Sequence, residues 1–122
     1  MSEIKNYRDL RVWKNSIDLV KETYQIARRL PLEEKYAFGD QIRRAAVSIP
    51  ANIAEGQARQ HRKVYLQHLS IAKGSLAELD TLLIVANELG YLSETDLAKL
   101  DEMLRDVRMP LDGLIQRLQN ET

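Results

Sequence analysis

The residues best suited to chemistry lie within positions 41–59, where polar side chains recur every three or four residues. On a helix of about 3.6 residues per turn, this spacing places them along one face. The members of this polar line are Gln41, Arg44, Ser48, Asn52, Glu55 and Arg59. Two interpretations are open for Ser48, Asn52 and Glu55: they fix the register of packed helices through hydrogen bonds, or they line a groove for a ligand or partner chain. The structural interpretation is favoured, because polar groups that specify packing are commoner than sites.

Metal chemistry would need more ligands than the chain offers. Di-iron bundles combine Glu-x-x-His motifs with further glutamates, but neither of the two histidines, His61 and His68, follows a glutamate by three. Glu55 and Glu78 would meet between two helices, yet two carboxylates without histidine make a poor iron site. An ion pair between Glu55 and an arginine is the favoured alternative, with three candidates: Arg43, Arg44 and Arg59.

The motifs of enzymes are also missing from the sequence. There is no glycine-rich phosphate loop and no serine in a nucleophile elbow. We therefore expect no catalytic residue, no metal and no cofactor, and we predict that the protein is not an enzyme.

Basic side chains form a second group of candidate residues, which would bind nucleic acid. Residues 36–75 contain six Lys/Arg but only two acids. The basic residues are Arg43, Arg44, Arg59, Arg62, Lys63 and Lys73. The whole chain has no net charge, with 14 Lys/Arg and 8 Asp/Glu in residues 1–75 and 4 and 10 in residues 76–122. Either the two halves neutralise each other, which we favour, or the first half presents a basic surface to a polyanion.

Length and composition place the chain among ordinary globular proteins. Its 122 residues form one domain, of which 44% are hydrophobic and 30% charged. The absence of cysteine excludes disulfides and thiolate metal sites and suits a reducing cytoplasm. No apolar segment approaches the length of a membrane span or a signal peptide. We expect a soluble cytoplasmic protein that does not contact membranes.

Apolar residues at alternating spacings of four and three predict four helices, over about residues 10–30, 34–57, 61–89 and 94–119. The expected inner seam of the first helix contains Trp13, Ile17, Val20, Tyr24 and Ala27. Short connections between consecutive helices indicate an all-α, antiparallel up-down-up-down four-helix bundle.

Local signals mark the ends and irregularities of these helices. Asp9 is the expected N-cap of the first helix, and Ser93 with Asp96 forms a capping box for the fourth. Gly90 is the expected C-cap of the third. Gly74 lies in the middle of the third helix and predicts a close approach by a neighbouring backbone.

Prolines interrupt the helical pattern at three positions. Pro31 ends the first helix. Pro50 and Pro110 lie within helices, where they predict kinks.

The second and third predicted helices are apolar beyond one seam, so each has a further face to bury. Either these two helices share a broad inner contact, or their outer faces form a subunit interface, which is the favoured alternative. The candidate interface residues are Val47, Pro50, Ala51, Ala54, Leu82, Ile84 and Val85.

Four segments carry a family resemblance: DLRVWKNSIDLV at 9–20, QIRRAAVSIPANIAEGQAR at 41–59, YLQHLSIAKGSLAELDTLL at 65–83 and LGYL at 89–92. Together they resemble the four-helix bundle proteins encoded within intervening sequences of bacterial 23S ribosomal RNA genes. Accessory proteins of diversity-generating retroelements are similar to this family.

This resemblance implies a homopentameric bundle with no known catalytic activity and no established biochemical role. The retroelement relatives are strongly basic and associate with nucleic acid and a reverse transcriptase. RNA, or a protein associated with nucleic acid, is therefore the alternative partner, whereas the neutral charge of this chain argues against direct binding.

Overall fold

The computed structural model describes residues 6–121, which form four long helices and two short ones. The long helices are α1 (Arg11–Arg28), α3 (Phe38–Ala58), α4 (Arg62–Glu88) and α5 (Glu94–Asn120). A 3₁₀ helix, η1 (Tyr7–Asp9), precedes α1, and the four-residue α2 (Leu32–Lys35) precedes α3. An N-terminal arm over residues 1–8 is expected from the sequence, and its first five residues lie outside the described part of the chain.

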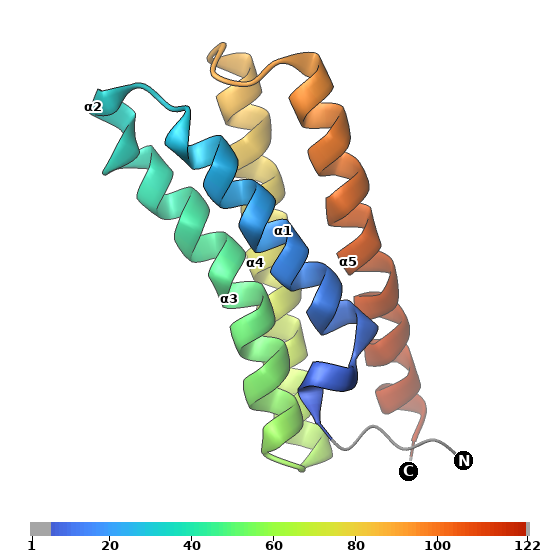
Figure 1. The fold of residues 1–122 in the computed structure, drawn as a ribbon. Coiled ribbons are helices and arrows are strands. Elements are labelled where there is room, and N and C mark those ends of the chain that lie inside the picture. The colour runs from blue at the N-terminus through green and yellow to red at the C-terminus, as the bar shows by residue number, and fades with distance from the viewer. Residues whose placement is uncertain (1–5, 122) are drawn as a thin grey trace.

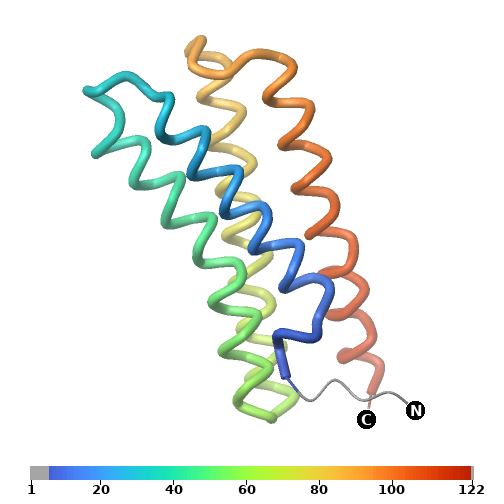
Figure 2. The backbone as a smooth tube through the Cα atoms, in the orientation of Figure 1, coloured from blue at the N-terminus to red at the C-terminus, as the bar shows by residue number. Residues whose placement is uncertain are grey.

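The long helices pack around one core, each against two neighbours: α1 against α3 and α5, and α4 against α3 and α5. Figure 1 shows the chain reversing direction at each connection, so that neighbouring helices are antiparallel. In Figure 2, the start of α1 and the end of α5 lie at the same end of the bundle as the turn between α3 and α4. The predicted fold class is confirmed. Among the described residues, no helix is both long and apolar enough to cross a membrane.

The core is made of leucine, isoleucine, valine and alanine from all four long helices. The inner seam of α4 is fully buried and has the predicted spacing: Leu69, Ala72, Leu76, Leu79, Leu83 and Ala86. In α5 a row with the same spacing is likewise buried: Leu100, Leu104, Val107, Leu111, Leu114 and Leu118. Because the chain positions its apolar residues in these regular rows, the side chains of facing helices can interdigitate.

The buried face of α1 is rotated relative to the prediction. Trp13, Ile17, Val20 and Tyr24 are only half-buried, and Ala27 alone of the predicted seam is buried. The other buried residues of α1 are Val12, Ser16, Leu19, Thr23 and Ile26. Ser16 Oγ donates to the carbonyl of Trp13 at 2.7 Å, and Thr23 Oγ1 donates to that of Leu19 at 2.7 Å. Since both hydroxyls find partners within the helix, they can be buried at little cost. A pattern that counts only apolar residues misses them.

Two predicted helix starts are wrong. Leu10, not Asp9, is the N-cap of α1, because residues 7–9 form η1. The second predicted helix is divided, because α2 ends at Lys35 and α3 begins only at Phe38. Pro31 precedes α2, where its fixed φ suits the entry to a helix.

The turn between α4 and α5 confirms two predictions. Gly90 adopts a φ of +84°, which a glycine accepts without steric cost. The N–H of Gly90 donates to the carbonyl of Asn87, and the N–H of Tyr91 donates to the carbonyl of Ala86. This is the hydrogen-bond pattern of a Schellman motif. Ser93 and Asp96 then form the predicted capping box. Pro50 and Pro110 each lie inside a continuous helix, so neither breaks its helix.

Candidate functional site

The polar line of α3 lies along its contact with α4. The hydroxyls of Ser48 and Ser75 are 2.8 Å apart and join the two helices. The amide nitrogen of Asn52 donates to the carbonyl of Ser48 at 2.8 Å and to its hydroxyl at 3.1 Å. All three bonds are half-buried, and the one between Ser48 and Ser75 links the two helices. They support the structural interpretation of Ser48 and Asn52.

His68 of α4 extends this line towards the turn between the two helices. Its Nδ1 lies 3.0 Å from Oδ1 of Asn52, and its Nε2 lies 3.6 Å from Oε2 of Glu55. Because the Asn52 amide nitrogen is used by Ser48, its oxygen must face the histidine, so Nδ1 carries the proton that is donated. Glu55 also lies 3.5 Å from Arg59, which is one of the three predicted arginine partners.

The close backbone approach occurs at Gly56, not at the predicted Gly74. A Cβ built on Gly56 would lie 2.7 Å from Cβ of His68 and 3.1 Å from Cδ1 of Tyr65, whereas one built on Gly74 would meet nothing within 4 Å. Gly56 therefore lets α3 pack directly against the first turns of α4. Burial in this contact raises the pKa of the Tyr65 phenol, an effect that the charge of Arg117 partly opposes.

Glu55 and Glu78 do not meet. Glu55 is beside His68, and Glu78 is ten residues further along α4, a distance of about 15 Å at 1.5 Å per residue. Within residues 6–121, no three His, Cys, Asp or Glu side chains are grouped as metal ligands.

The predicted basic residues are divided among four places. Arg43 lies over the ring of Tyr24 of α1, pairs with Asp40 of its own helix and donates to the carbonyl of Lys35 of α2 at 2.8 Å. Lys73 faces α5, with its ammonium 2.9 Å from Asp112. Arg44 is exposed near the middle of α3.

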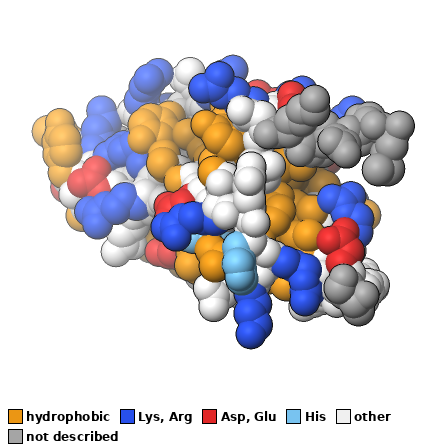
Figure 3. All heavy atoms as spheres, turned by 90° about the horizontal axis from the view of Figure 1, so that it is seen from below, with side chains coloured by type: hydrophobic (Ala, Val, Ile, Leu, Met, Phe, Trp, Pro, Cys, Tyr) orange, Lys and Arg blue, Asp and Glu red, His pale blue; other side chains and the backbone are white. Residues whose placement is uncertain are grey.

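The remaining three basic residues, Arg59, Arg62 and Lys63, are exposed at the turn between α3 and α4. Arg62 donates to the carbonyl of Leu118 at 3.0 Å. Figure 3 views this end of the bundle and shows Lys and Arg side chains separated by acidic, hydrophobic and uncharged ones. The six residues therefore do not form one surface.

The predicted interface residues also lie on different faces of α3 and α4. Pro50 is buried within the bundle, so it offers no exposed surface. Val47, Ala51 and Ala54 share a face of α3 that borders α1. Successive residues of α4 are rotated by about 100° around the helix axis. Val85 therefore lies on nearly the same face as Leu82, whereas Ile84 is rotated by about 160° from Leu82.

The sequence interpretation missed a second seam on α4, which we call the outer seam. It has the same spacing of four and three as the inner one and consists of Ile71, Ser75, Glu78, Leu82, Val85 and Leu89. Ile71, Val85 and Leu89 are 51%, 39% and 57% exposed. Of its members, only Leu82 and Val85 are among the predicted interface residues. The spacing of four and three from Ile71 to Leu89 is the sequence signal that could have revealed the whole seam.

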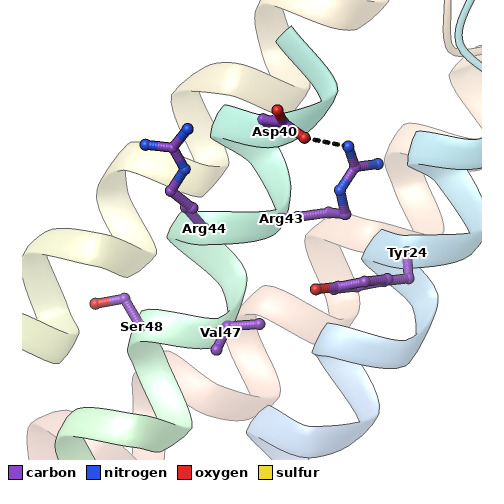
Figure 4. A pocket seen from close by; sticks show the side chains of 6 residues that line it. All are labelled: Tyr24, Asp40, Arg43, Arg44, Val47 and Ser48. Atoms are coloured by element: carbon purple, nitrogen blue, oxygen red, sulfur yellow. Dashed lines mark hydrogen bonds and ion pairs between the residues drawn. The ribbon is translucent and has the colours of Figure 1, made fainter. Parts of the chain in front are cut away.

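A hollow of about 620 Å³ crosses the outer face of α3 and is lined by Tyr24, Asp40, Arg43, Arg44, Val47 and Ser48. In Figure 4, Arg43 and Val47 lie on the side of α3 that faces Tyr24 of α1, whereas Arg44 and Ser48 lie on the opposite side. The hollow therefore combines the apolar side chain of Val47 with two arginines, Arg43 and Arg44. The sequence interpretation did not assign Tyr24 or Asp40 to a site.

Two further polar contacts hold the end of the bundle away from the α3–α4 turn. The Tyr91 hydroxyl donates to Glu34 at 2.8 Å, and this hydrogen bond to a carboxylate raises the pKa of the phenol. The Arg29 guanidinium, 3.1 Å from Asp96, lowers the pKa of that carboxyl below its ordinary value of 3.8. The first contact joins α2, and the second the end of α1, to the region around the α4–α5 turn.

Fold and contacts together define an all-α four-helix bundle in which Ser48, Asn52 and Glu55 of the polar line bond to other side chains of the same chain. The model of the 23S rRNA-intervening sequence protein family matches residues 8–113, and the chain belongs to this family. None of the curated proteins matches the chain. The family has no known catalytic role.

Proposed function

We propose that this protein is a non-enzymatic scaffold that assembles as a homo-oligomer through the outer seam of α4. The observation that carries the proposal is the exposure of Ile71, Val85 and Leu89 in a seam with the spacing of a helix–helix contact. Exposed apolar side chains that recur along one face of a helix are typical of a protein interaction surface. The similarity to proteins of ribosomal RNA intervening sequences makes a ring of five chains the expected assembly.

A scaffold role also suits the side chains that could otherwise do chemistry. Ser48, Asn52 and Glu55 are occupied by bonds to Ser75, His68 and Arg59. Their geometry serves the packing of α3 against α4 and leaves no nucleophile paired with a base.

Particle mass tests this proposal. We expect light scattering to give a mass of about five chains for the unchanged protein. A double variant, Val85→Glu with Leu89→Glu, should lower this mass because it places two charges in the contact. Met109→Glu is the control, since Met109 is a similarly exposed apolar residue on α5.

Circular dichroism of each variant checks that the helix content is retained. A single-chain mass for the unchanged protein would contradict the proposal, as would equal masses for the double variant and the control.

RNA binding at the α3–α4 turn is the second candidate function. It is favoured by one observation: Arg59, Arg62 and Lys63 are exposed within five residues of one another. Phosphate contacts would make log affinity for a structured RNA fall linearly with log salt concentration. Replacing these three residues with alanine should remove binding, whereas alanine at Lys14 and Lys21 on α1 should not. Binding that survives the triple replacement would exclude this surface.

A further inference from the structure

A second hollow, of about 350 Å³, adjoins the first on the outer face of α1. It is lined by Val20, Lys21, Tyr24, Gln25 and Arg28, and it shares Tyr24 with the hollow over α3. Together they make one surface over both helices, which we call the α1–α3 groove. On α1 it spans nine residues, Val20 to Arg28, and on α3 it also spans nine, Asp40 to Ser48. Each side is therefore about 12 Å long, or slightly more than two helical turns.

The floor of the α1–α3 groove is apolar. Val47 is 41% exposed, and Val20 and Tyr24 are half-buried. One face of the Tyr24 ring is covered by the guanidinium of Arg43, whose Cζ lies 6.0 Å from the ring centroid. The exposed part of the floor is consequently suited to aliphatic or aromatic side chains from a partner.

The rim of the groove is strongly basic. Lys21, Arg28, Arg43 and Arg44 surround it, and Asp40 is the one acid among the lining residues. Asp40 is paired with Arg43. Lys21 and Asp18 of the same helix are both exposed, and their charged atoms are 3.9 Å apart, so this ion pair is weak. Arg28 and Arg44 are exposed and form no ion pair with any residue between 6 and 121. The rim thus has positive charge available for a partner.

We infer that the α1–α3 groove binds an acidic, amphipathic segment of a partner protein, about two to three helical turns long. Its apolar side chains would cover Val20, Tyr24 and Val47, and its carboxylates would pair with Arg28 and Arg44. This is the helix-in-groove mode of recognition, in which apolar anchors repeat every three or four residues. The charge pairs with Arg28 and Arg44 would orient the segment in the groove and raise its rate of association.

A protein segment fits this groove better than a nucleic acid does. Binding to a single strand requires aromatic faces on which bases stack, and Tyr24 already has one face against Arg43. Val47 lines the same hollow as Arg43 and Arg44, one helical turn beyond them, and a sugar–phosphate backbone has no apolar group to place against it. The alternation of apolar and basic residues instead complements a helix with one apolar face and acidic flanks.

A synthetic peptide provides a direct test. The probe is a fluorescein-labelled peptide of about fourteen residues, with leucine every three or four positions and glutamate elsewhere, so that a helix would cover the groove. We expect saturable binding by fluorescence anisotropy. A peptide with glutamine in place of glutamate should bind at least ten-fold more weakly.

Three variants of the full chain locate the binding site. Arg44→Glu should weaken binding of the acidic peptide at least ten-fold, and Val47→Asp at least five-fold. Lys63→Glu is the matched control, because it makes the same change of charge at the exposed α3–α4 turn and should leave affinity within two-fold. Equal weakening by Lys63→Glu and Arg44→Glu would show binding to net charge alone and overturn the inference.

Other occupants of the groove would give different results. Displacement of the peptide by oligouridylate at lower concentration than by unlabelled peptide would identify a nucleic-acid surface. A fall in particle mass caused by Val47→Asp would show that a second copy of the chain occupies the groove. Absence of saturable peptide binding at millimolar concentration would also overturn the inference. The assembly proposal is separate, because it depends on Val85 and Leu89.

Discussion

The two seams of α4 have the same spacing, yet only one is buried. The inner seam packs into the core beside α3 and α5 and is almost fully removed from water, whereas Ile71, Val85 and Leu89 of the outer seam remain exposed. The outer seam also contains Ser75 and Glu78, and Ser75 bonds to Ser48 at the edge of α3. The comparison shows that spacing identifies the apolar faces of a helix but does not decide which face its own chain covers.

Shortening a side chain on each seam should give the largest difference in the free energy of unfolding. Leu79→Ala on the inner seam should lower the free energy of unfolding by about 2–5 kcal/mol, because it leaves a cavity among fully buried neighbours. Val85→Ala on the outer seam should cost little within a single chain, about 0.5 kcal/mol or less. Urea denaturation measures both values.

Protein concentration sharpens this comparison. If the outer seam forms a subunit contact, the effect of Val85→Ala should grow with protein concentration, because assembly stabilises the folded chain by mass action. Ile84→Ala is the control, since Ile84 is exposed on α4 but lies off both seams. The same concentration dependence for both variants would contradict the distinction between them.

Gly56 of α3 and Gly74 of α4 should respond to alanine in opposite directions. Gly74→Ala should stabilise the chain by roughly 1 kcal/mol, since it improves helix propensity and the new Cβ meets nothing within 4 Å. Gly56→Ala should destabilise it by about 1–3 kcal/mol, because the new Cβ would lie 2.7 Å from that of His68 and force α3 and α4 apart.

Thermal or urea unfolding of the two alanine variants, compared with the unchanged chain, measures this difference. Stabilisation by Gly56→Ala would show that the contact at His68 can relax without loss of packing.

The sequence predicted the fold because most of its local signals agree. The apolar rows of α4 and α5, the Gly90 turn and the Ser93 capping box each specify the same helices. The errors arose where a local signal had a competitor. Ser16 and Thr23 are buried because their hydroxyls bond within α1, and Asp9 is held in η1 before α1 begins.

The candidate site was less predictable, because it depends on contacts between helices. The polar line of α3 was visible from its spacing, but its partners His68 and Ser75 could be assigned only once the register of α3 against α4 was known. Spacing along one chain does not determine that register. For the same reason Gly74 was chosen over Gly56, although only the latter faces a neighbouring helix closely.

The smallest expected effect lies outside both seams, where Arg29 near the end of α1 pairs with Asp96 in the first turn of α5. The Arg29 hydrogen bond lowers the pKa of Asp96. The ionised carboxylate therefore stabilises the fold above pH 3.8, the ordinary value, and this contribution is lost as pH falls through the lower pKa of the folded state.

Asp96→Asn removes the charge but keeps an oxygen for the Ser93 cap. We expect this variant to be slightly less stable than the unchanged chain at pH 7 and equally stable well below pH 3.8, as measured by urea denaturation across this range. Asp101→Asn is the control, because Asp101 is exposed on the same helix without an ion pair to any described residue. A difference for Asp96→Asn that persists undiminished in acid would mean that the side chain acts through helix capping and not through its charge. The Arg29 pair would then contribute nothing to holding α1 against α5.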